Sequence, residues 1–146
     1  MNIQENTSPK GTLSIKVFDK SGSLVETYEE TNLIVGTGKQ ALATLLAAAT
    51  NGKKVTKIGF GTDGTEPSSG NTSLTSPFVK DIDSYTNPDT SSVVFNWSLV
   101  TTEANGKAIQ EFGLICFDNS LFARRTRAVI NKTSDLRLEG TWKIQF

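Results

Sequence analysis

The chain has 146 residues and 15.8 kDa, is 36% hydrophobic and 21% charged, and balances 15 basic against 15 acidic side chains. This predicts one soluble domain with a real core, and the zero net charge argues against nucleic acid or membrane partners. The absence of histidine and the single cysteine, Cys116, exclude intramolecular disulfides and cysteine zinc clusters and remove the usual general base. We therefore expect no enzyme activity, cofactor or metal.

The N-terminus is polar and carries no signal-peptide pattern. We expect residues 1–10 to form a flexible arm and residues 11–146 to form the single domain. The longest apolar run, around Ala41 to Ala49, is too short to span a bilayer.

A β-hairpin is predicted first, because apolar residues alternate over 12–19, a turn signal follows at 19–22, and a second strand pattern covers 23–30. The period then changes to that of a helix, with leucines three and four residues apart after a capping-box pattern of Thr37 and Gln40. Asn51-Gly52 is expected to end this helix.

Strand patterns dominate the rest of the chain. They cover residues 54–60, 76–83, 91–101, 108–117, 121–130 and 135–146, and Asn105-Gly106 predicts a hairpin between two of them. About eight strands and one short helix predict a mainly β fold, an antiparallel β-sandwich or partly closed barrel. Trp97 and Trp142 are expected in the core with their N–H groups hydrogen-bonded.

Two patterns that could carry ligand chemistry are weak. The sequence VGTGK lacks the first glycine and the final Ser or Thr of a phosphate loop, since Leu33 and Gln40 stand there. Asp81 and Asp83 are two residues apart, so on one strand both would face the same way and could hold calcium or act as an acid–base pair. A solvated face is the favoured interpretation.

The densest basic cluster is Arg124, Arg125 and Arg127. We expect Arg125 and Arg127 on one face of a strand with Leu121 and Val129, and Arg124 on the other face. It could contact carboxylates of a neighbouring subunit, phosphate or sugar acids, or guard an edge strand. Cys116 is expected to be a small buried hydrophobic residue.

The long polar stretch from Gly59 to Pro77 is uncommon for a compact domain unless it is functional or disordered. Its polar side chains suit a contact surface. The candidate interface residues are Thr62, Asp63, Thr65, Ser68, Asn71, Arg124, Arg125 and Arg127.

Several segments resemble a group of small tailed-phage and prophage structural proteins, described as tail-fibre-like, collar-fibre-like or tail proteins. The resemblance spans about Asn32 to Phe146. It rests on the residues Ile58, Gly61-Thr62-Asp63-Gly64-Thr65, Pro67, Leu74, Glu111, Gly113-Leu114, Asp118 and Leu121-Phe122-Ala123-Arg124. The pattern's Asp-Gly is Asp118-Asn119 here, which is compatible with a turn.

This resemblance implies a non-enzymatic structural component of the virion, made in the bacterial host cytoplasm and assembling with copies of itself, as a trimer or another cyclic oligomer, and with other virion proteins. The alternatives are a capsid decoration or cement protein, or a module at the tail tip that binds a host surface glycan. A glycan platform would need exposed aromatic rings, for which Tyr28, Phe78 and Tyr85 are the candidates.

Overall fold

The computed structural model of the chain describes residues 9–48 and 51–146. The predicted arm therefore lies outside the described residues except for its last two, and the first strand already begins at Lys10. The elements, in chain order, are β1 (Lys10–Phe18), β2 (Leu24–Ile34), α1 (Gly36–Ala48), the 3₁₀ turn η1 (Asn51–Lys53), β3 (Val55–Gly61), β4 (Phe78–Asp81), β5 (Ser84–Thr86), β6 (Ser92–Leu99), β7 (Ala108–Cys116), β8 (Leu121–Asn131) and β9 (Arg137–Gln145).

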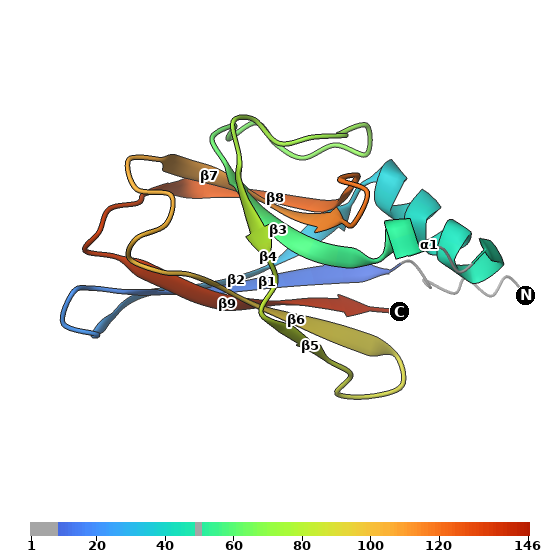
Figure 1. The fold of residues 1–146 in the computed structure, drawn as a ribbon, viewed down its shortest axis with the longest axis horizontal. Coiled ribbons are helices and arrows are strands. Elements are labelled where there is room, and N and C mark those ends of the chain that lie inside the picture. Colours follow the sequence, from blue (N-terminus) through green and yellow to red (C-terminus); the bar gives the residue numbers. More distant parts are fainter. Residues whose placement is uncertain (1–8, 49–50) are drawn as a thin grey trace, which may run out of the picture.

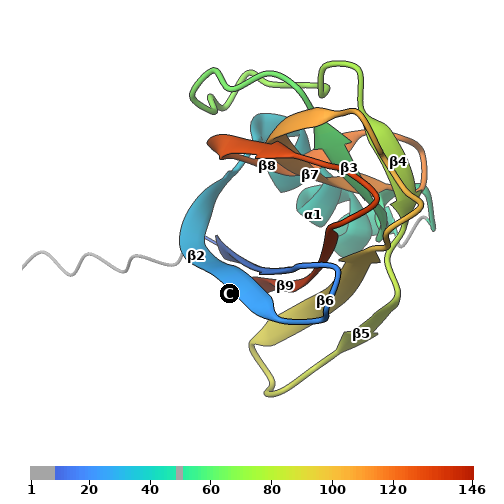
Figure 2. The ribbon, with the colours of Figure 1, turned by 90° about the vertical axis from the view of Figure 1, so that its left-hand side faces the viewer.

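The nine strands form one antiparallel sheet in the order β4-β3-β7-β8-β2-β1-β9-β6-β5. The sheet curls into a half-barrel, so that β3, β7 and β8 face β1, β9 and β6, and β2 arches between the two layers (Figures 1 and 2). The prediction of a mainly β sandwich or partly closed barrel with one helix is confirmed.

The core lies between the two layers, and strands such as β1, β6 and β9 contribute apolar residues to it at alternate positions. In β1, for example, Leu13, Ile15 and Val17 are buried. Phe60, Trp97 and Phe112 meet at the centre with ring centroids 5.5–6.0 Å apart in tilted and edge-on arrangements. These aromatic contacts join the two layers.

The predicted hairpin at Asn105-Gly106 is wrong. β6 pairs with β9 and β5, and β7 pairs with β3 and β8, so the connection between β6 and β7 crosses from one layer to the other. Left-handed backbone falls at Ala104 and Gly106, which fits a longer loop. Lys132 stabilises this loop by donating from Nζ to Asn105 Oδ1.

The capping box predicted at Thr37 is also wrong, because α1 begins at Gly36 and the Val35 carbonyl accepts its first N–H groups. The Thr37 hydroxyl instead donates to the Leu121 carbonyl and ties the helix to β8. Gly38 allows this close approach, since a Cβ there would lie 2.0 Å from the Phe122 carbonyl oxygen. The glycines of VGTGK therefore serve packing.

The two sheet edges, β4 and β5, are short and follow each other in the chain. They are tied to the rest of the fold by the ion pair of Lys80 with Glu103 (2.8 Å) and by the bond from Asp83 N to Asn96 O (2.8 Å). In residues 9–48 and 51–146, no helix is long and apolar enough to cross a membrane.

Candidate functional site

The polar stretch from Gly61 to Pro77 folds back as a separate layer over β3, β7 and β8 (Figure 1). Two charged side chains beneath it are almost fully buried, Arg124 of β8 at 2% exposure and Glu111 of β7 at 1%. Arg124 Nε donates to Glu111 Oε2 at 2.7 Å. We refer to residues 61–77 as the docked loop and to these two residues as the buried ion pair.

The Arg124 guanidinium holds the first half of the docked loop by its backbone. It donates from Nη2 to the Asp63 carbonyl (3.0 Å), and from Nη1 to the Thr65 carbonyl (3.0 Å) and Asn71 Oδ1 (3.1 Å). Carbonyl oxygens that would otherwise lose water on burial are thereby satisfied by a charged donor.

Glu111 holds the second half of the docked loop. Its Oε1 accepts the Thr75 N–H at 2.6 Å and the Asp63 N–H at 3.4 Å. Both carboxylate oxygens therefore have partners, and the buried ion pair is fully hydrogen-bonded, which is the condition under which a buried charge pair is tolerated.

Asp63 shapes the turn that follows. Its Oδ1 accepts from the hydroxyl (2.6 Å) and the N–H (2.8 Å) of Thr65, and these bonds, more than the neighbouring Arg124 charge, lower the pKa of Asp63. The carboxylate is thus kept ionised within an Asx turn.

The apolar contact beneath the docked loop is made by Leu74, which packs with Val35, Ile115 and Leu121. It lies over Gly59 and Gly113, which are paired across β3 and β7. A Cβ at Gly113 would lie 2.8 Å from Leu74 Cδ1, so the absence of side chains there lets the docked loop lie flat.

The docked loop brings together six of the eight residues that the sequence singled out: Thr62, Asp63, Thr65, Ser68, Asn71 and Arg124. Asn71 Oδ1 also accepts the Ser68 N–H. The outer surface of the docked loop is polar and consists of the exposed residues Gly64, Thr65, Glu66, Ser68, Ser69, Gly70, Thr72, Ser73, Thr75, Ser76 and Pro77.

Arg125 and Arg127 lie elsewhere, where β2 meets β8. Arg125 Nε donates to the Tyr28 hydroxyl at 2.8 Å, and Arg127 lies over the Tyr28 ring at 5.0 Å. As predicted, Arg124 lies on the opposite face of β8 from Arg125 and Arg127. Leu121 does not share the face of Arg125 and Arg127, because it packs under the docked loop on the side of Arg124. A β-bulge between Leu114 and Ile115 changes the alternation there.

Sequence reasoning did not assign a site role to Glu111, although a lone carboxylate inside the apolar segment AIQEFGLIC was a signal for a buried partner.

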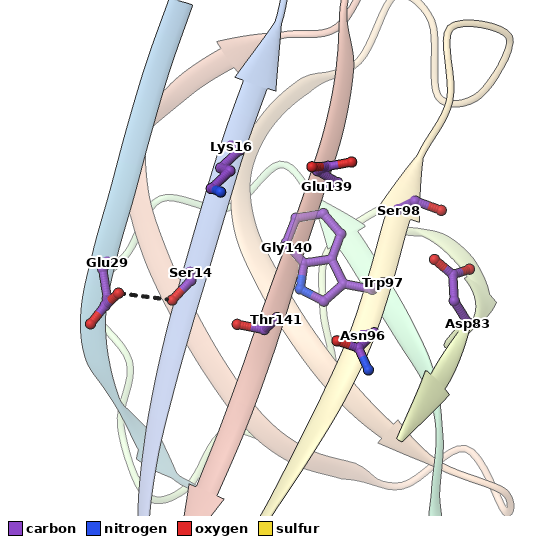
Figure 3. A pocket seen from close by; sticks show the side chains of 10 residues that line it. All are labelled: Ser14, Lys16, Glu29, Asp83, Asn96, Trp97, Ser98, Glu139, Gly140 and Thr141. Carbon is purple, nitrogen blue, oxygen red and sulfur yellow. Dashed lines mark hydrogen bonds between the residues drawn. The ribbon is translucent and has the colours of Figure 1, made fainter. Parts of the chain in front are cut away.

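A second candidate site is a shallow polar trough of about 530 Å³ on the outer face of β1, β9 and β6 (Figure 3). It is lined by Ser14, Lys16, Glu29, Asp83, Asn96, Trp97, Ser98, Glu139, Gly140 and Thr141. The Ser14 hydroxyl donates to Glu29 across 3.2 Å, and Arg137 pairs with Glu139 at 3.1 Å. These groups offer hydrogen bonds spread along the trough, with no activated nucleophile among them.

Asp81 and Asp83 do not share a strand, because β4 ends at Asp81 and Asp83 precedes β5. Only Asp83 lines the trough. Among the described residues, no three His, Cys, Asp or Glu side chains are grouped so that they could hold a metal ion.

Cys116 is completely buried, as predicted, and burial raises the pKa of its thiol. The prediction for the tryptophans is confirmed for Trp142, whose Nε1 donates to Asn32 Oδ1 at 2.8 Å. Trp97 is also in the core, as predicted, but the expected hydrogen bond is wrong there, because its buried Nε1 has no acceptor within the described part of the chain.

The three aromatic rings considered for a glycan platform differ. Tyr28 and Phe78 pack against the core, whereas Tyr85 is 66% exposed. Tyr85 borders a groove of about 340 Å³ whose other lining residues are Leu45, Lys53, Lys54, Val55, Phe95 and Phe122.

Comparison with known proteins gives no match: the sequence fits no protein family and no curated protein, and the fold fits no solved structure.

Proposed function

We propose that the chain is a non-enzymatic structural component of a bacteriophage virion, in the tail, baseplate or collar-fibre region, and that it assembles through subunit contacts. The observation that carries this proposal is the docked loop, which presents a row of exposed polar groups on a backbone fixed by the buried ion pair of Arg124 and Glu111.

A surface held in this way suits recognition of another protein. Ordering a free loop of this length on binding would cost conformational entropy residue by residue, whereas this loop is already ordered by the fold. Its serine, threonine and glycine residues leave backbone and hydroxyl groups available for hydrogen bonds to a partner. Other copies of the chain and other virion proteins are the proposed partners.

The resemblance to phage structural proteins supports the same conclusion, because several of the residues on which it rests lie in the docked loop and in its support. The motif positions Gly61–Thr65, Glu111, Gly113 and Arg124 are those that build the docked loop and its support. A sequence pattern that specifies one exposed surface, with no catalytic group in it, is what an assembly module requires.

The mass of the purified chain in solution tests assembly. We expect light scattering to give a closed oligomer, a trimer or another cyclic form, at high protein concentration. Glu66→Arg, at an exposed position of the docked loop, should weaken the formation of this oligomer. Lys20→Glu, a charge reversal in the exposed β1–β2 turn, should leave it unchanged. A single-chain mass at all concentrations, together with absence from purified virions, would reject the proposal; location of the chain on capsids would favour the cement alternative.

Host-glycan binding is kept as a second candidate function because Tyr85 is exposed beside Lys53 and Lys54. An aromatic face with nearby cations suits an acidic sugar. A glycan array should then show binding that Tyr85→Ala abolishes and Tyr85→Phe largely keeps, since the stacking face remains. Silence of the full chain on the array removes this candidate.

A further inference from the structure

A hollow of about 260 Å³ opens between the docked loop, β4 and the turn that joins β7 to β8. We refer to it as the apolar hollow. Its volume is below the roughly 300–1,000 Å³ of a pocket for a drug-sized ligand, so it suits a single side chain. It is open to solvent, because the lining residues Thr72, Ser73, Pro77, Val79 and Asn119 are exposed. The other lining residues are Leu74, Ile115 and Leu121.

A large apolar side chain lies beside the apolar hollow without entering it. Phe117 is 59% exposed and does not line the hollow. The Lys57 ammonium contacts both features, since Nζ lies 5.7 Å from the centre of the Phe117 ring and donates to Asn119 Oδ1, at the rim of the hollow, over 2.9 Å. One surface of the chain therefore carries an exposed aromatic ring and a hollow of the size of one side chain.

The charges beside Phe117 and beside the apolar hollow have opposite signs. The acceptors of Lys57 Nζ are neutral, namely two backbone carbonyls and the Asn119 amide. Asp81 is exposed and follows Val79 by two residues in β4, so its side chain is on the face of the hollow. In residues 9–48 and 51–146, neither Lys57 nor Asp81 has an ion-pair partner.

Other charged side chains near this surface are engaged within the chain or belong to a different site. Lys53 and Asp118 pair with each other at 2.8 Å, and Lys107 donates to the Ser76 carbonyl. Lys54 lines the separate groove of about 340 Å³. The cation beside the ring and the anion beside the hollow are therefore the charges that a partner would meet.

We infer that two copies of the chain associate about a twofold axis through this surface, each placing Phe117 in the apolar hollow of the other and Lys57 against the other copy's Asp81. A twofold contact uses the same patch on both copies, so the patch must carry both the ring and the hollow that receives it. Insertion of each ring brings its neighbouring cation to the anion beside the hollow, and this pairing occurs twice. The inference rests on the proposed assembly of copies and names its partner and symmetry.

The composition and order of the surface suit such a contact. Interfaces have an apolar centre enriched in aromatic residues and a polar rim. Here Leu74, Val79 and Phe117 form the centre, and the exposed serines and threonines of the docked loop form the rim. The turn that carries Phe117 is held by backbone hydrogen bonds to the carbonyls of Gly52 and Lys54, each of 2.9 Å. Because both parts are preformed, little conformational entropy is lost on association.

Charge reversal in full-length chains, followed by sedimentation, tests the paired charges. Asp81→Lys and Lys57→Glu should each weaken self-association by about tenfold or more, since like charges then face each other twice. A mixture of the two variants should recover association as a heterodimer with one chain of each kind, because every charge again meets its opposite. Asp135→Lys, at an exposed aspartate in the β8–β9 turn, is the matched control and should leave association unchanged.

The mixture separates a contact between copies from a role within one chain. If Lys57 only stabilised its own turn, the loss in Lys57→Glu would persist in the mixture, and that result would overturn the inference. If Lys57→Glu does not fold, Asp81→Lys still decides, because Asp81 is exposed and has no ion-pair partner in the described residues. Association of Asp81→Lys as tight as that of the parent chain would likewise overturn the inference.

The inserted ring is tested in the same way. Phe117→Ala should weaken association by about thirtyfold or more, the loss typical of an aromatic hot spot. Val25→Ala truncates another exposed apolar side chain, 55% exposed on β2, and should have no effect. Equal effects of the two variants would show that Phe117 does not enter a hollow.

The failures of this inference and of the proposed function are distinguishable. A closed trimer has no twofold axis, so its detection would overturn the inference and leave the proposed function standing. Oligomers that tolerate Asp81→Lys and Phe117→Ala would do the same. If the chain stays a single copy at all concentrations, the inference fails, and the search for the chain in purified virions then decides the proposed function.

Discussion

Arg124 donates from Nε to Glu111 Oε2 over 2.7 Å, and both side chains are buried beneath the docked loop. This contact connects β7 to β8 and at the same time fixes the loop above them, because the remaining donors of Arg124 bind the carbonyls of Asp63 and Thr65. One charge pair therefore determines the position of a whole surface.

Removal of one member of the buried ion pair should be severe. Arg124→Met leaves the Glu111 carboxylate buried without its cation, and we expect the free energy of unfolding to fall by about 3–5 kcal/mol. Urea titration followed by circular dichroism measures this change. A loss below about 1 kcal/mol would show that the pair is not buried as described.

The double variant Arg124→Met/Glu111→Leu separates stability from loop order. With both charges replaced by apolar groups, we expect most of the lost stability to return. The docked loop still lacks its donors, so limited proteolysis should cut within residues 61–77 of the double variant and spare the parent chain.

The fit of the docked loop to the sheet gives a third prediction. Gly113→Ala places a Cβ 2.8 Å from Leu74 Cδ1 and 3.0 Å from Leu121 Cδ1, and overpacking of this kind costs about 1–3 kcal/mol. Adding Leu74→Ala should remove part of that cost by clearing the clash. Gly70→Ala is the control, because a Cβ there meets nothing within 4 Å. Equal effects of Gly113→Ala and Gly70→Ala in thermal unfolding would refute the packing of Leu74.

The apolar pattern of the sequence predicted the strands well where one face of the strand is buried in the core and the other is not. In β1, buried residues alternate with half-buried or exposed ones, and its hairpin with β2 forms as expected, with Gly22 at positive φ in the turn. The C-terminal strand predicted over 135–146 forms as β9 and lies between β1 and β6. Period-two patterning is enough for such strands because one face is buried.

Long-range relationships were not predictable from local pattern. Asn105-Gly106 favours a tight hairpin, yet β6 and β7 belong to opposite layers, because tertiary pairing overrides the turn signal. Arg124 and Arg125 are adjacent and chemically identical, but Arg124 supports the docked loop and Arg125 donates to the Tyr28 hydroxyl of β2. The partner of each arginine depends on strand register and on a bulge in the sheet, which no spacing rule fixes.

The burial of Cys116 predicts an unreactive thiol. The side chain is 0% exposed, and burial raises the pKa, so at any given pH the folded chain contains less thiolate than an unfolded one. We expect a disulfide reagent at pH 8 to modify the folded protein on the order of 10³-fold or more slowly than the protein in urea. Comparable rates in the two states would show that β7 opens readily at Cys116.

The two tryptophans provide a matched comparison of hydrogen bonding in the core. Trp97 and Trp142 are both buried, but Trp142 Nε1 donates to Asn32 Oδ1, whereas Trp97 Nε1 has no acceptor among the described residues. Replacement by phenylalanine removes the same atoms in each case. Trp142→Phe also leaves the Asn32 oxygen without a donor, while Trp97→Phe removes an unsatisfied group.

We therefore expect Trp142→Phe to lower the free energy of unfolding by about 1–3 kcal/mol more than Trp97→Phe. Urea titrations followed by circular dichroism compare the two variants without relying on tryptophan fluorescence. Asn32→Ala in the Trp142→Phe background should recover part of the loss, because the unpaired acceptor is then gone. If Trp97→Phe costs as much as Trp142→Phe, the Trp97 indole has an acceptor, such as a buried water, and the difference between the two sites disappears.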